Sequence, residues 1–127
     1  MKKLFLLLVI IVSPAGFAQS TFDKWPAMKE FHEIISQTFH PSEEGNLEPI
    51  KSRSLELAQK AERLNMGEKP KEFSTKEILV ATEKLQIKSW ALHKKIKIGS
   101  SDKEITILLS EIHDIFHEIA GLCANEK

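Results

Sequence analysis

Apolar residues recur at steps of three and four along four separate stretches of the chain, and this spacing is the strongest constraint on its fold. In the last stretch the apolar positions are Ile105, Leu108, Leu109, Ile112, Ile115, Phe116 and Ile119. Such spacing places side chains on one face of an α-helix, whereas a strand needs alternation. No stretch combines the alternating pattern with the turn signals of a β-hairpin. The sequence therefore predicts an all-α chain.

Caps and helix breakers indicate where the four helices begin and end: about residues 23–40, 47–65, 74–98 and 101–122. Asp23 is a candidate N-cap, and capping boxes of the form Ser-x-x-Glu begin at Ser74 and Ser101. Pro41 is expected to end the first helix, because a proline disfavours the α region for the residue before it. Short connections favour antiparallel neighbours. We therefore expect an antiparallel, up-down-up-down four-helix bundle.

The first 18 residues have the order of an export signal. Lys2 and Lys3 form a basic region, residues 4–12 are an unbroken apolar run, and small residues precede a cleavage point after Ala18. The apolar run has the length of a signal-peptide core and is too short to span a bilayer. We expect a signal peptide over 1–18 and one bundle domain over 19–127. The mature protein would then be periplasmic or secreted, with no membrane span of its own.

The charge balance and the absence of known catalytic motifs narrow the classes of function that the sequence predicts. Without Lys2 and Lys3, 16 basic side chains remain against 18 acidic ones. Such a near-neutral surface lacks the basic stripe that nucleic acid requires. The single cysteine, Cys123, cannot form an intramolecular disulfide. It is expected to be a buried small hydrophobe; the alternatives are a metal ligand or a partner in an intermolecular bond. Phosphate loops and nucleophile motifs are absent, so we expect a non-enzymatic protein. From the four helical stripes we expect a monomer or weak dimer.

Three of the five histidines are candidate metal ligands. His113 and His117 are four residues apart, so their side chains stack on one helical face. His32 and Phe39 fall on the apolar face predicted for the first helix. Counting about 1.5 Å per residue from the helix ends places His32 level with His113, roughly 14 Å above the base of the bundle. Imidazole suits zinc, copper and nickel. His32, His113 and His117 therefore form a candidate three-histidine metal site; the alternative is that they are boundary residues with ordinary hydrogen bonds.

Further donors extend these candidate sites. The fourth ligand of the three-histidine site would be Met28, Glu33 or Glu56. His40 and His93 are expected near the opposite end of the bundle, where His40 would sit at a helix C-terminus. A second, weaker site would combine His40, His93 and either Glu43 or Glu44.

The placement of Met28 early in the first helix and His117 late in the last resembles the cytochrome b562 and cytochrome c′ group of exported four-helix bundles. The resemblance covers the whole mature chain in length, topology and export. It implies a non-covalent haem with Met28 and His117 as axial ligands. The Cys-x-x-Cys-His motif of covalent haem attachment is absent.

The sequence thus leaves three functions open. The first is an exported transition-metal-binding protein, a carrier, buffer or sensor, that uses His32, His113 and His117. The second is a b562-like electron-transfer protein that binds haem. The third is a metal-free helical module that binds another exported protein, with the histidines incidental.

Overall fold

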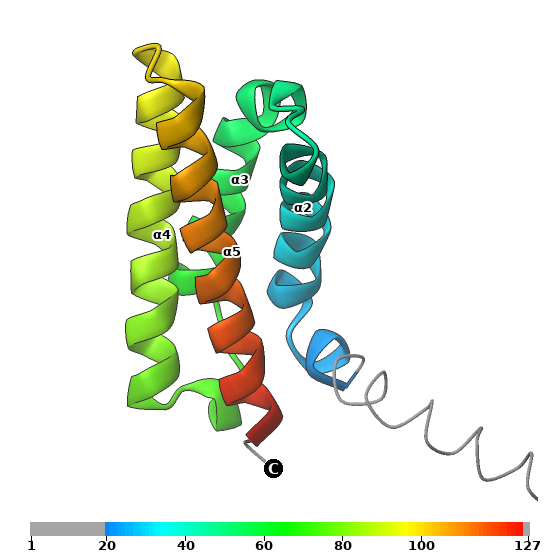
Figure 1. Ribbon diagram of the computed structural model, residues 1–127. Helices are drawn as coiled ribbons and strands as arrows, with labels where there is room; N and C mark the ends of the chain where they lie inside the picture. Colours follow the sequence, from blue (N-terminus) through cyan, green and yellow to red (C-terminus); the bar gives the residue numbers. More distant parts are fainter. Residues whose placement is uncertain (1–19, 126–127) are drawn as a thin grey trace, which may run out of the picture.

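The computed structural model describes residues 20–125, and every regular element in that range is a helix (Figure 1). Residues 20–24 are helical, and the elements that follow are α2 (Pro26–Glu43), α3 (Glu48–Met66), the short 3-10 helix η1 (Lys71–Phe73), α4 (Lys76–Lys97) and α5 (Asp102–Asn125). The prediction of an all-α chain is confirmed. The predicted signal peptide, 1–18, and its cleavage point lie outside the described residues. Among the helices of residues 20–125, none is long and apolar enough to cross a membrane.

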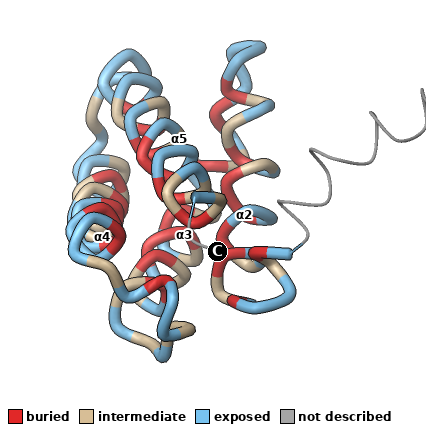
Figure 2. The backbone as a smooth tube through the Cα atoms, turned by 90° about the horizontal axis from the view of Figure 1, so that it is seen from below, coloured by how far each residue is buried: buried red, intermediate tan, exposed pale blue. Residues whose placement is uncertain are grey.

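The long helices pack around one hydrophobic core. Along the chain, α2 packs on α3, α3 on α4 and α4 on α5, and α5 also contacts α2. Figure 2 shows that the buried positions lie on the sides of the helices that face one another. Fully buried large side chains come from α2, α3, α4, α5 and the loop before α2; they include Trp25, Met28, Phe31, Leu57, Leu64, Leu85, Leu92 and Ile112. Burial of each such side chain contributes about 1.5–3 kcal/mol.

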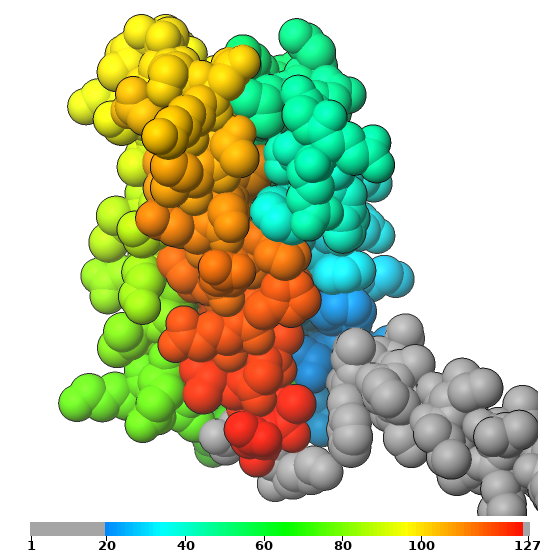
Figure 3. Space-filling view, viewed as in Figure 1, coloured from blue at the N-terminus to red at the C-terminus, as the bar shows by residue number. Residues whose placement is uncertain are grey.

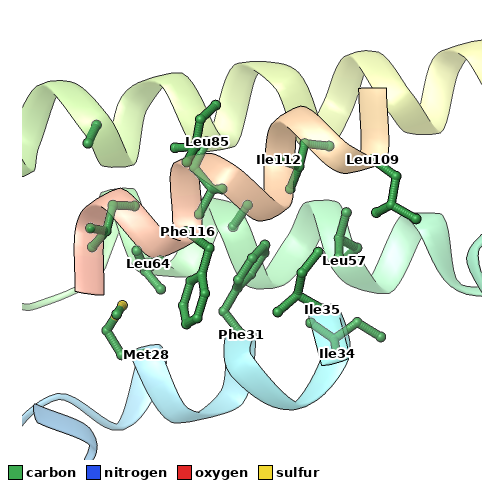
Figure 4. Close-up of a cluster of buried hydrophobic side chains, with 14 of the residues drawn as sticks. Met28, Phe31, Ile34, Ile35, Leu57, Leu64, Leu85, Leu109, Ile112 and Phe116 are labelled. Carbon is green, nitrogen blue, oxygen red and sulfur yellow. The ribbon is translucent and has the colours of Figure 1, made fainter. Parts of the chain in front are cut away.

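The predicted apolar face of α5 is the face that the structure buries. Its buried residues are Ile105, Leu109, Ile112, Ile115, Phe116, Ile119 and Cys123. Ile112 and Phe116 meet side chains from α2 and α4 in the centre of the core, as Figure 4 shows. Cys123 is 2% exposed, which confirms the prediction of a buried thiol.

The expectation that Pro41 ends the first helix was wrong. Pro41 lies inside α2, which continues to Glu43. Pro41 has no N–H to donate to the carbonyl of Gln37, and its ring crowds that carbonyl, but so close to the helix end only this one backbone bond is lost. The Pro41 carbonyl in turn accepts the N–H groups of Glu44 and Asn46, each at 3.0 Å. These bonds close the final turn despite the proline.

The start of α2 also differs from its prediction. Its N-cap is Trp25 instead of Asp23, and the Trp25 side chain makes no capping hydrogen bond. The first helical residue is Pro26, whose ring restricts φ to a helical value and whose missing N–H would have no partner there in any case. The helix therefore begins three residues later than the sequence indicated.

The capping boxes at the other two helices had different outcomes. Ser101 caps α5 as predicted, because its Oγ accepts the N–H of Glu104 at 3.2 Å. At α4 the cap is Thr75 instead of Ser74, and its Oγ1 accepts the N–H of Ile78 at 3.3 Å. At its other end α5 runs on through Gly121 to Asn125, beyond the predicted end near residue 122.

Replacement of the fully buried Ile112 by Asp is expected to lower the free energy of unfolding by about 3 kcal/mol or more, because an unpaired charge would enter the core. Ile107 lies on the same helix but is 50% exposed, so Ile107→Asp is the matched control and should stay within about 0.5 kcal/mol. Denaturant unfolding followed by circular dichroism measures both. Similar losses in the two variants would contradict the assignment of the core face.

Candidate functional site

The rotation of α5 places two histidines at the border between its buried and exposed faces. His113 follows the buried Ile112, and His117 follows the buried Phe116. A step of one residue turns a side chain by about 100° around the helix. The side chain of His113 is consequently 22% exposed, and His117 is exposed. Both rings remain reachable from solvent.

A stack of aromatic rings joins this pair to α2. The ring of His113 lies flat on Phe39 of α2, with centroids 3.8 Å apart and an interplanar angle of 9°. The ring of His117 meets His113 nearly edge-on, at 4.4 Å and 71°. Phe39 lies on the apolar face predicted for its helix, but no local sequence pattern indicates its contact with His113. The stack restricts the rotation of the His113 imidazole.

The two imidazoles present one nitrogen each to the other. The Nε2 atoms of His117 and His113 are 3.1 Å apart, a hydrogen-bonding distance. In the neutral pair one Nε2–H donates and the other Nε2 accepts, so the two rings have different tautomers. Two nitrogens bound tetrahedrally to zinc at 2.0–2.1 Å would be about 3.3 Å apart. The pair is therefore spaced as a two-nitrogen chelate.

The environment favours the neutral form of His113. Burial is the largest cause that lowers the pKa of His113 below its usual value, and the nearby His117 lowers it further. Asp114, whose Oδ1 is 3.9 Å from Nδ1 of His113, and Glu43 oppose this shift. The net effect is a lowered pKa, so the imidazole of His113 stays neutral to a lower pH than an ordinary histidine does.

His32 does not lie on the core face, and that part of the prediction was wrong. The side chain is exposed, and its ring lies 5.1 Å from Phe22 and 6.0 Å from Phe116. Within residues 20–125, no group of three or more His, Cys, Asp or Glu side chains is arranged to hold a metal ion. The structure thus brings His113 and His117 together but does not join His32 to them as a third ligand.

The displacement of His32 follows from the register between α2 and α5. His113 faces Phe39 on α2, which is seven residues or about 10 Å beyond His32. The level estimate took residues 23 and 122 as the bases of the two helices. In the structure α2 begins at Pro26 and α5 ends at Asn125, each three residues later. The estimate counts forward along the chain to His32 and backward along it to His113, so the two errors add and account for nearly all of the offset.

The same offset brings the end of α2 near the histidine pair. Nδ1 of His40 is 3.3 Å from Oε1 of Glu43, and both side chains are largely exposed. Both also act electrostatically on His113. The expectation that His40 belongs to the opposite end of the molecule from His113 was therefore wrong.

His93 lies elsewhere, between α3 and α4. Its Nδ1 is 2.8 Å from the Oγ of Ser54, and its ring meets Trp90 edge-on at 5.9 Å. The second predicted site, from His40, His93 and either Glu43 or Glu44, is not formed: among the described side chains, these residues are not arranged to hold a metal ion. His93 instead forms a hydrogen bond that joins α4 to α3.

The other predicted ligands have separate surroundings. Met28 is 0% exposed and points from α2 into the core (Figure 4). Glu33 is exposed, whereas Glu56 accepts a hydrogen bond from Nε of Arg53 at 2.9 Å. That bond is the first cause of a lowered pKa at Glu56. A surface cavity of about 560 Å³ is lined by α3 and Trp90 of α4, and neither Met28 nor His117 is among its lining residues.

Comparison of the chain with protein-family models, with curated proteins and with solved structures finds no match. The functional argument therefore rests on the geometry of the chain itself.

The lowered pKa of His113 predicts how stability depends on pH. The unfolded state binds a proton at about pH 6.5, whereas the folded state does so only at lower pH. The contribution of His113 is thus complete above pH 6.5 and is lost as the pH falls toward the pKa of the folded state. A His113→Gln variant should lack this component. As the pH falls from 8 to 5, denaturant unfolding should therefore show the free energy of unfolding of the wild type decreasing relative to that of the variant. A difference between the two proteins that stays constant, or that changes in favour of the wild type, would contradict the assignment.

Proposed function

We propose that this chain is an exported, non-enzymatic protein that binds a transition-metal ion through Nε2 of His113 and His117, as a carrier, buffer or sensor. The observation that carries the proposal is the 3.1 Å separation of the two Nε2 atoms. Both nitrogens can reach one ion without a change of helix geometry, because an i, i+4 pair already stacks on one face. The ring that donates must transfer its proton from Nε2 to Nδ1, and both rings must turn so that their Nε2 lone pairs converge on the ion.

The surroundings of the pair support binding at the surface. His117 is exposed, so a hydrated ion can approach without opening the core. His113 is held against Phe39, which reduces the rotamer freedom that would be lost on binding. Exposed carboxylates nearby, on Asp114 and Glu118, favour the approach of a cation.

Ligand chemistry indicates an order of metals. Imidazole binds zinc, copper and nickel, and divalent affinities generally rise from nickel to copper and fall again at zinc. We therefore expect copper(II) to bind more tightly than nickel or zinc. A site with two protein nitrogens leaves further coordination positions to water or to another donor.

The proposal includes the topology and the export of the chain. An up-down-up-down four-helix bundle is supported by the contacts between successive helices and by the return of α5 to α2. The sequence colours of Figure 1, which run in opposite directions along successive helices, support it as well. Periplasmic or secreted localisation rests on the order of charged, apolar and small residues over 1–18.

The haem alternative would require a ligand that is now packed in the core. Met28 would have to present its sulfur to a haem, and the core around it is occupied by large side chains such as Phe31 and Phe116 (Figure 4). A metal ion needs no such space. The interaction-module alternative predicts that the histidines can be removed without loss of function, so metal titration separates it from the proposal.

Calorimetric titration of copper(II), nickel(II) and zinc(II) tests the site. The wild type should bind each ion saturably, and His113→Ala or His117→Ala should weaken copper binding at least about tenfold, which corresponds to about 1.4 kcal/mol. Each change leaves a single nitrogen in place of a chelate.

Two further histidine variants serve as controls. His93→Ala should leave affinity unchanged, because His93 is bonded to Ser54 away from the pair. His32→Ala should change it little, whereas the three-histidine set expected from sequence requires a loss nearly as large as that of His117→Ala. If wild type binds no better than the His113/His117 double alanine variant, the proposal fails.

Export is tested by processing. Expression of the complete sequence in a secreting host should yield an exported protein that begins at Gln19, because small residues precede the bond after Ala18. Intact-mass spectrometry of the exported fraction measures this. Exported material that retains Met1–Ala18 would contradict the predicted signal peptide.

A further inference from the structure

The histidine pair leaves a bound ion with an incomplete set of ligands. Two nitrogens come from His113 and His117, and residues 20–125 contain no third His, Cys, Asp or Glu arranged with them to hold a metal. Glu43 of α2 acts electrostatically on His113, but its Oε1 is engaged with Nδ1 of His40 at 3.3 Å. Zinc in proteins is almost always bound by four ligands, at least three of them from protein. Donors from outside residues 20–125 would therefore complete the site.

The outer face of α5 is open to such a donor. In Figure 3 this helix, coloured orange to red, lies uncovered at the front of the molecule. Thr106, Ser110 and Gly121 lie on the same side of α5 as His117, because each is separated from it by close to a whole number of helical turns. A Cβ added at Gly121 would meet no atom within 4 Å. Small side chains on both sides of His117 allow another helix to approach closely.

We propose that a second copy of this chain completes the site, so that one zinc ion joins two α5 helices through His113 and His117 of each. This inference rests on the proposed function and extends it to the stoichiometry of the complex. A two-fold axis through the ion relates the two copies, and the same surface is then used on both sides. The four imidazole nitrogens make a tetrahedral set.

The charges around the pair make the association depend on the ion. Asp114 and Glu118 are exposed on α5 beside the histidines. Two copies brought together by the two-fold axis would place these like charges near one another, and the dimer is disfavoured without a counterion. A doubly charged cation between the copies offsets that repulsion. The chain is therefore a monomer without zinc and a dimer with it.

The test measures mass and stoichiometry on the same material. Protein purified after expression of the complete sequence is freed of metal and titrated with zinc, with multi-angle light scattering for mass and calorimetry for stoichiometry. The mass is expected to double, with saturation near one zinc per two chains, and a chelator should reverse the change. His117→Ala should stay monomeric at all zinc concentrations.

A steric variant separates binding from association. Gly121→Trp adds bulk to the face of α5 beside His117 and leaves both histidines in place. It should bind zinc as a monomer, with the two-fold stoichiometry lost. Leu55→Trp is the matched control, because Leu55 is 44% exposed on α3, away from the pair, and this variant should dimerise like the wild type. Circular dichroism checks that both variants are folded.

The outcomes distinguish the two claims. A wild-type monomer that binds one zinc per chain overturns the second copy as partner and leaves the metal-binding proposal intact. A Gly121→Trp variant that dimerises with zinc as the wild type does overturns the assignment of this face. Absence of saturable zinc binding overturns the inference together with the proposed function.

Discussion

The burial of Ile112 and Phe116 fixes the rotation of α5 about its axis, and the candidate site depends on that rotation. Both side chains are nearly inaccessible and pack among residues of the other long helices. Once they point inward, the next residue along the helix in each case, His113 or His117, must lie at the edge of the buried face. The free energy that holds the pair in place is thus the hydrophobic stabilisation of the core. A substitution that let α5 rotate would move both histidines at once.

The contact between Phe39 and His113 links the core to the surface pair. The two rings lie nearly parallel, with centroids 3.8 Å apart, so each buries much of one face of the other. The same contact holds one imidazole in a fixed orientation, and His117 then meets it from the next turn of α5. A metal ion that binds only the folded chain would stabilise it by mass action, so the site and the fold are thermodynamically coupled.

The sequence predicted what depends on local spacing and failed where positions depend on accumulated lengths. The buried face of α5, the Ser101 cap and the burial of Cys123 follow from local patterns, and the structure confirms them. The pairing of His113 with His117 is also local, because it needs only an i, i+4 step. The level of His32 required the starts and ends of two helices, and errors at Pro26 and Asn125 added to displace it by about two turns. Helix boundaries carry weak sequence signals, so register between distant helices could not be derived from them.

The central claim is that the Nε2 atoms of His113 and His117 together bind one ion, and nitrogen-15 NMR of the imidazole rings tests it most directly. In long-range proton–nitrogen spectra the metal-free pair should show two different tautomers, because one Nε2 donates to the other. Addition of zinc should bring both rings to a state with a metal-bound Nε2 and a protonated Nδ1. His93, held by Ser54, should keep its signals. Unchanged His113 and His117 nitrogens at saturating zinc, or an equal response from all five histidines, would contradict the account.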